Sequence, residues 1–216
     1  MLMKNAVLLS VVAALSVSPM IPAVAAAAPS SAVAPAKAVT PKATIDTLDA
    51  ALLKAMRGGN RIGYSGRYAI VSPVVRKVYN FDRIASLTLG SRWSKLTPAQ
   101  RKEFVGVLAE YTVATYAARF DNYEGEHFAV VSSKTMQPGT VGVFSTLTMR
   151  NGKIHRFDYL LQQQDGQWRI VNVVADGVSD LSLKRSEYDK TIETKGFSAL
   201  IAHLKAQIAQ YAKGKH

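Results

Sequence analysis

The sequence predicts an α+β fold: a twisted antiparallel β-meander of about four strands, wrapped by N-terminal and C-terminal helices. Two observations lead to this prediction. The apolar period is helical up to Gly125, changes to two after it, and becomes helical again from about residue 183. Two hairpin dipeptides, Asn151-Gly152 and Asp165-Gly166, divide the middle stretch into strands. Helices followed by sheet followed by helices are typical of α+β proteins.

Residues 1–28 are predicted to be a secretory signal peptide. Lys4 supplies the positive start, 6–17 form a short apolar run, and Ala23-Val24-Ala25 gives small residues for cleavage near Ala25–Ala28. An uncleaved membrane anchor is the alternative, but the run is far shorter than the roughly 20 residues that span a bilayer as a helix. Residues 29–43 are rich in Ala, Pro, Ser and Val and are expected to be a flexible linker. Residues 44–213 then form one folded domain.

The helices are expected in order along the chain. Apolar residues from Ile45 to Met56 recur at helical spacing, and Gly58-Gly59 ends that helix before a loop over 60–66. Further helices are expected at 67–79, with a kink at Pro73, and at 81–89. Thr97-Pro98 is a start signal, with Thr as N-cap, for a long helix that ends near Phe120.

Four strands are expected at 126–133, 140–150, 153–164 and 167–176, followed by helices at 183–194 and 197–213. A half-exposed antiparallel sheet should alternate apolar and polar residues. Here apolar residues are expected on both faces. Val143 and Phe144 point to opposite faces, as do Phe157 and Leu160, and Ile170 and Val174 point to the face opposite that of Val171 and Val173. Both faces therefore look apolar and should be covered. Either helices pack on both sides, or one face lines an apolar cavity; periodicity does not separate these alternatives.

The charge is concentrated in one segment. The chain has 27 Lys and Arg against 15 Asp and Glu, a net charge of +12. Residues 51–102 contain eleven basic side chains and one acidic one, Asp82. This segment is either a solvated basic surface or one that faces anionic lipid or an acidic partner. The hydrophobic content of 48% excludes a disordered polybasic protein.

No motif for catalysis or for a cofactor is apparent. The chain has no cysteine, which excludes thiolate metal sites, disulfides and thiol nucleophiles. The four histidines, His127, His155, His203 and His216, have no zinc-site spacing. We therefore expect no catalytic residues, no metal and no cofactor.

Several segments together resemble the MlaC-type family of periplasmic phospholipid-binding proteins, also called toluene-tolerance auxiliary proteins. They are 79–85 with Leu89-Gly90, then Trp93, 96–100, 166–179, 185–188 and 195–201. The similarity covers about residues 45–212. Residues 111–123 with Gly125-Glu126 and Phe128 resemble the hopanoid-associated HpnM branch more closely, although Val178-Ser179 keeps the pattern of the general family.

The resemblance implies a soluble periplasmic carrier of phospholipid or hopanoid that moves lipid between inner-membrane and outer-membrane transport components. It also implies an apolar lipid pocket between sheet and helices. The candidate lining residues are Trp93, Leu108, Tyr111, Tyr116, Phe128, Phe144, Leu147, Phe157, Tyr159, Leu161, Val173 and Val178. Val178 is expected in a loop at the pocket mouth.

Two other functions remain open at this point. An exported enzyme acting on a small hydrophobic substrate would need titratable groups inside the pocket, for which Asp158, His155 and Tyr159 are the candidates. A nucleic-acid binder would use the basic segment. Export argues against the latter, so no nucleic-acid partner is expected.

Overall fold

The computed structural model describes residues 39–214. The expected signal peptide 1–28 and most of the expected linker therefore lie outside the described residues. The first helix begins at Pro41, three residues before the expected start of the folded domain, because Thr40 acts as its N-cap and accepts a 3.1 Å hydrogen bond from the backbone N–H of Ala43. Within residues 39–214, none of the helices combines the length and apolar character that a bilayer span requires.

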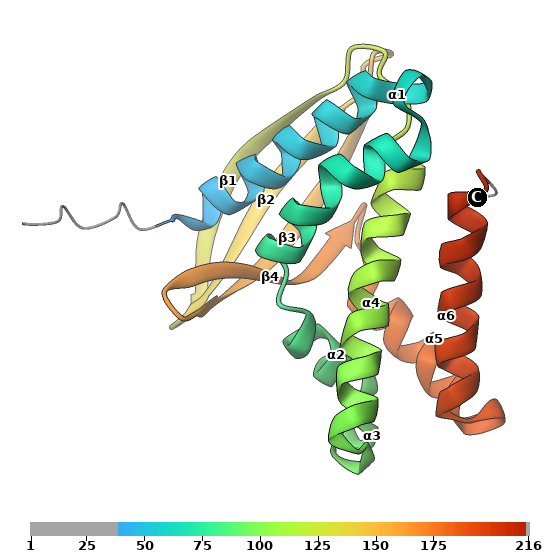
Figure 1. Ribbon diagram of the computed structural model, residues 1–216. Coiled ribbons are helices and arrows are strands. Elements are labelled where there is room, and N and C mark those ends of the chain that lie inside the picture. The colour runs from blue at the N-terminus through green and yellow to red at the C-terminus, as the bar shows by residue number, and fades with distance from the viewer. Residues whose placement is uncertain (1–38, 215–216) are drawn as a thin grey trace, which may run out of the picture. The chain divides into compact units, whose positions relative to one another are not determined.

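The helix α1 (Pro41–Val78) is bent where a loop over 60–66 was expected. Its backbone leaves helical geometry at Gly59 (φ 50°) and Gly63 (φ 63°), positive φ angles that glycine adopts without steric cost. The two arms lie side by side over the sheet (Figure 1). The buried Arg67 fixes this bend, because its guanidinium donates to the carbonyls of Gly59 (3.0 Å) and Ala117 (2.7 Å).

The remaining helices mostly follow their expected ranges. They are α2 (Phe81–Leu89), α3 (Ser91–Lys95), α4 (Pro98–Arg119), α5 (Asp180–Lys195) and α6 (Phe197–Ala212). The start of α4 is a capping box: Thr97 Oγ1 accepts from the Gln100 N–H, and Gln100 Oε1 accepts from the Thr97 N–H. The sequence prediction missed α3 and the first turn of α5, for which Ser179 is the N-cap.

The sheet is an antiparallel meander in the order β1 (His127–Gln137), β2 (Thr140–Thr148), β3 (Ile154–Gln164), β4 (Gln167–Ala175) and β5 (Val178–Ser179). Asp165-Gly166 forms the expected two-residue turn, with positive φ at both residues. The β2–β3 connection is longer than expected. Its Met149 and Lys153 are still joined by a backbone hydrogen bond, and Gly152 occupies the left-handed position.

A bulge in β4 changes which residues share a face. Leu160 pairs with Asn172 while Leu161 pairs with Ile170, so Val171 is an extra residue. Ile170 and Val173 therefore lie on the same face of the sheet, where they pair with Leu161 and Tyr159 of β3. The expectation that they lie on opposite faces was wrong. A strict period of two fails here because one inserted residue reverses the alternation.

The two faces of the sheet are covered to different extents. On the first face Val141, Val143, Tyr159, Leu161 and Ile170 are buried against the apolar side of α1. On the second face Phe144, Leu160 and Val174 are half-buried, and Ile154 is 56% exposed. The expectation that both faces are covered was therefore wrong. The hydrophobic core lies against the first face, and the second face is partly open to solvent.

Asp49 of α1 is buried without full hydrogen bonding. It is 5% exposed, and its Oδ1 atom has no hydrogen-bond partner among the described residues. Burial, reinforced by the nearby Asp46 carboxylate, raises the pKa of Asp49 from 3.8 to about 7. Between these values the folded chain holds a proton that the unfolded chain releases. The free energy of unfolding therefore falls as the pH rises from about 4 to about 7.

We predict that Asp49→Asn removes this penalty. The variant should melt at a higher temperature than the wild type at pH 8, and the difference should shrink at pH 4, where the wild-type carboxyl is protonated. Thermal unfolding followed by circular dichroism across this pH range measures the effect, with the exposed Glu193→Gln as control. The same melting difference at both pH values would contradict the prediction.

A candidate ligand cavity between sheet and helices

The first face of the sheet is not filled along its whole length. Beyond the part that α1 covers, a partly open cavity of about 180 Å³ lies between the ends of β3 and β4 and the helices α2, α4 and α5. Its lining residues are Tyr79, Ile84, Leu108, Thr112, Thr115, Tyr116, Arg119, Phe120, Phe157, Val173, Ala175, Asp180 and Lys184. Ile84, Leu108 and Tyr79 are buried and form its floor, whereas Arg119 and Asp180 are exposed and mark its mouth.

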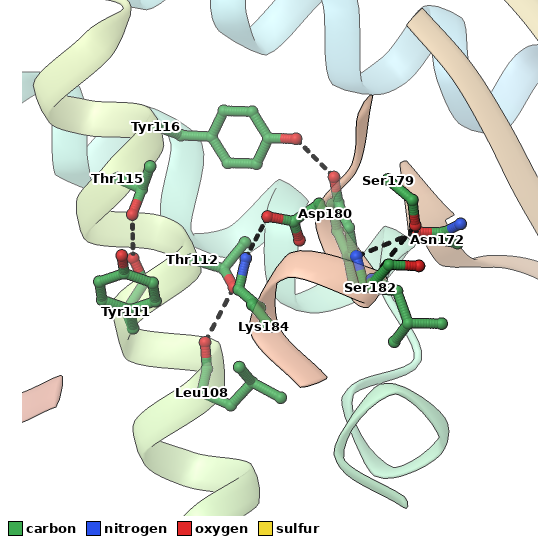
Figure 2. A network of polar contacts seen from close by, with 12 residues as sticks. Leu108, Tyr111, Thr112, Thr115, Tyr116, Asn172, Ser179, Asp180, Ser182 and Lys184 are labelled. Carbon is green, nitrogen blue, oxygen red and sulfur yellow. Dashed lines mark hydrogen bonds and ion pairs between the residues drawn. The ribbon is translucent and has the colours of Figure 1, made fainter. Parts of the chain in front are cut away.

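One face of α4 forms a wall of this cavity. Leu108, Thr112, Thr115, Tyr116 and Arg119 each lie three or four residues from another member of the set, so they project from the same side of the helix. The two threonine hydroxyls donate to the carbonyls one turn back, Thr112 to Leu108 (2.9 Å) and Thr115 to Tyr111 (2.8 Å), as Figure 2 shows. Their hydrogens are therefore used within the helix, and the wall offers little competing polarity to an apolar ligand.

Aromatic rings continue from this wall to the sheet. Tyr116 stands 5.6 Å from Phe120, Phe120 stands 6.3 Å from Phe128, and Phe128 stands 6.5 Å from Phe157, measured between ring centroids. Phe157 in turn stacks on Tyr159. Rings at these separations attract one another and resist rearrangement. The row therefore holds the helix and sheet sides of the cavity at a fixed distance near Phe157.

Tyr79 and Tyr116 supply the polar pair at the cavity floor. Their hydroxyls are 2.5 Å apart and hydrogen-bonded to each other. Burial raises the pKa of both phenols well above 10, so both stay neutral. The backbone N–H of Asn80 donates to the carbonyl of Ile170 (2.9 Å), which fixes Tyr79 against β4. Each hydroxyl therefore has the other as partner, and one phenolic hydrogen remains at the cavity floor.

The structure brings together some of the twelve residues that the sequence nominated. Leu108, Tyr116, Phe157 and Val173 line the cavity. Phe128 and Tyr159 contact Phe157 through their rings. Leu147 pairs with Phe128 in the sheet register, one row beyond. Val178 lies in β5 rather than in a loop, 51% exposed and paired with Ala175 of the lining, so it lies beside the mouth.

Four nominated residues lie elsewhere. Trp93 is on α3, where the guanidinium of Arg101 lies over its ring. Tyr111 stacks on Tyr211 of α6. Phe144 is on the second face of the sheet, and Leu161 is wholly buried in the core beneath α1.

The sequence reasoning missed Thr112, Thr115 and Arg119, although their spacing from Leu108 could have identified them. It also missed Asp180 and Lys184. The expected start of α5 at residue 183 left Asp180 outside the helix, so its position four residues before Lys184 on the same helix face was not recognised.

A larger surface recess of about 640 Å³ lies at the start of α1, bordered by Val39, Thr40, Lys77, Trp168 and Arg169. It contains none of the nominated residues. The smaller cavity is the better candidate for the ligand site, because it lies between the sheet and three helices and its lining includes four of the nominated residues.

A histidine–carboxylate pair exists, but outside the cavity. His155 Nδ1 lies 2.7 Å from Asp176 Oδ2, and this hydrogen bond, with one from the Arg156 N–H, lowers the pKa of Asp176. The His155 side chain is 29% exposed and that of Asp176 52%, and neither lines the cavity. Among the described residues no three His, Asp or Glu side chains converge as metal ligands. The histidine–carboxylate pair therefore lies outside the cavity lining.

The comparisons with known proteins agree with this architecture. The family model described as MlaC protein matches residues 46–206. The toluene tolerance protein ttg2D of Pseudomonas putida is 23% identical over 145 residues, 67% of each chain. The intermembrane phospholipid transport system binding protein MlaC of Haemophilus influenzae is 22% identical over 135 residues, which cover 61% of this chain and 63% of that protein.

A solved structure has the same fold. It is a phospholipid-binding protein from Ralstonia solanacearum in complex with a phospholipid, with a TM-score of 0.68 at 22% identity. The match covers 82% of this chain and 99% of that one. At this level of identity the likeness concerns the fold.

Proposed function

The chain belongs to the MlaC protein family, and on that premise we propose that it is a periplasmic carrier that binds phospholipid and moves it between the inner and outer membrane. The observation that carries this proposal is the cavity between the first face of the sheet and α2, α4 and α5. The relative from Haemophilus influenzae is named for intermembrane phospholipid transport, and the structural neighbour holds a phospholipid.

The physical task of such a carrier is to keep an acyl chain out of water. Each buried CH₂ gains about 0.8 kcal/mol, so a free lipid crosses an aqueous space slowly without an apolar container. The floor formed by Ile84 and Leu108, with Phe157 and Val173 opposite, is such a container. No bond is made or broken in this task, in keeping with a tyrosine pair that burial keeps neutral.

The cavity volume adds a requirement. About 180 Å³ is below the roughly 300–1,000 Å³ typical of pockets for drug-sized ligands. We therefore propose that a complete lipid is accommodated only when α5 moves away from α4. The short β4–β5 turn at Asp176-Gly177 is the place from which α5 could swing, since α5 follows β5 directly.

A hopanoid carrier and an exported enzyme are the two alternatives that would use the same pocket. A hopanoid ligand, as in the HpnM branch, would occupy the same apolar floor, and the features described above do not favour it over phospholipid. An exported enzyme with the same pocket would need an acid–base pair inside, whereas the His155–Asp176 pair lies outside the lining. The expected signal peptide and export to the periplasm remain predictions that accompany the carrier proposal.

We predict that Val178→Glu weakens lipid retention, because it puts a carboxylate beside Ala175 at the mouth of an apolar cavity. Lipid extracted from the purified protein should fall several-fold per mole while thermal unfolding changes little, since Val178 is already 51% exposed. Val131→Glu, at a 67% exposed valine of β1, is the matched control. Equal lipid content in wild type and Val178→Glu would argue against a mouth at this position.

Several cations of the basic segment 51–102 form contacts within the protein, which leaves a smaller basic surface for a partner. Arg67 is buried, Arg76 pairs with Glu110, Arg92 pairs with Asp189, and Arg101 donates to backbone carbonyls. Three exposed cations, Lys54, Arg57 and Arg61, instead border one recess at the bend of α1. We propose that this recess faces the anionic membrane surface or an acidic membrane-bound transport component.

Replacing Lys54, Arg57 and Arg61 with Gln should slow lipid delivery at low salt and have less effect at high salt, where screening is strong. Transfer of a fluorescent phospholipid to vesicles of phosphatidylethanolamine and phosphatidylglycerol measures delivery with the membrane alone. The triple replacement of the exposed Lys102, Lys190 and Lys213 changes the net charge equally and serves as control. Equal slowing in the two triple variants would show that net charge, not this recess, matters.

A further inference from the structure

Three charged side chains lie in the lining of the otherwise largely apolar cavity. Arg119 comes from the last turn of α4, and Asp180 and Lys184 come from the first turns of α5. Figure 2 shows Asp180 and Lys184 facing the α4 wall, with Thr112 and Thr115 opposite. Arg119 and Asp180 suit the dipoles of the helix ends at which they lie. The position of Lys184 in the lining is not explained by those dipoles.

Lys184 is the least accessible member of this group. Its side chain is 15% exposed, and its ammonium pairs with Asp180 and lies 5.7 Å from the centre of the Tyr111 ring. Asp180, by contrast, has a side chain that is 55% exposed. An ammonium on a largely buried side chain is stabilised by an anionic partner, whereas an exposed carboxylate is well hydrated on its own. Asp180 can therefore leave the pair and return to water at little cost.

Apart from the one phenolic hydrogen that the Tyr79–Tyr116 pair leaves over, the other polar groups of the lining offer no free donor to an anion. The hydroxyls of Thr112 and Thr115 donate to α4 carbonyls, and those of Tyr79 and Tyr116 are bonded to each other. Lys184 and Arg119 are the cationic donors of the lining. Together with Asp180 they carry one net positive charge, which matches the single negative charge of a phosphodiester.

We propose that Lys184 and Arg119 bind the phosphate of the lipid headgroup and that Asp180 holds Lys184 until the phosphate replaces it. This inference rests on the carrier function proposed above. The acyl chains then extend from the mouth towards Leu108 and Phe157, and the phosphate remains where Arg119 is exposed. A phosphate-bearing lipid is thereby selected over a neutral lipid with the same chains.

The two members of the ion pair give opposite predictions. Lys184→Met removes a phosphate ligand and should weaken binding of phosphatidylglycerol by roughly tenfold, as expected for one lost hydrogen-bonded ion contact. Asp180→Asn removes the competitor and should strengthen it by several-fold. Binding of diacylglycerol with the same acyl chains should change little in either variant.

The measurement is the affinity of the purified, delipidated protein for each of these two lipids, carrying a fluorescent acyl chain. Lys190→Met, an exposed lysine of the same helix, controls for the loss of one positive charge. Lys184→Arg should keep the preference for phosphatidylglycerol and shows that the site tolerates substitution. Thermal unfolding of every variant is recorded alongside.

Each result distinguishes the headgroup site from the carrier function. Weaker phosphatidylglycerol binding in both Lys184→Met and Asp180→Asn would mean that the pair only supports the fold and would overturn the headgroup site. Equal losses in Lys184→Met and Lys190→Met would overturn it as well. Wild-type protein that binds both lipids equally, with no effect of Lys184→Met, would leave the carrier intact but remove the site. Wild-type protein that binds neither lipid would overturn the carrier itself.

Discussion

The structure depends on how the first face of the sheet is shared between two groups of helices. Ile45, Leu48 and Leu52 of α1 pack on one part of that face and form a dry core there. Near Phe157 and Val173, α4 stands off instead, and a cavity remains. Arg67 couples the two parts, because it fixes the bend of α1 to the α4 carbonyl of Ala117. The face is therefore packed on its α1 side and keeps space for a ligand on its α4–α5 side.

The charges follow the same division. The cavity floor has only neutral polar groups, held neutral by burial, whereas Arg119, Asp180 and Lys184 lie towards its mouth. An amphiphile fits this gradient with its chains inward and its phosphate outward. Part of the basic excess of the chain forms internal bonds, as at Arg67 and Arg76, and another part gathers at the α1 bend. The positions of the charged side chains therefore indicate the function better than the net charge of the chain does.

Much of the fold was predictable because local signals mark its boundaries. The Thr97 capping box, the Asp165-Gly166 turn and Gly196 after α5 each act through their own backbone geometry. The bulge at Val171 was not predictable, since an inserted residue has no signature in apolar periodicity. The cavity was only partly predictable for the same reason. Apolar residues such as Leu161 and Val173 look alike in sequence, and only the position of α1 decides which is core and which faces the cavity.

The central claim is that an acyl chain occupies the first face of the sheet beside α4. Site-specific photocrosslinking tests it most directly, with a benzophenone side chain placed either at Val173 of the lining or at Phe144 on the second face, and with protein loaded with radiolabelled phospholipid. The account predicts a lipid adduct from Val173 and none above background from Phe144. Equal labelling of both positions, or labelling of Phe144 alone, would contradict it.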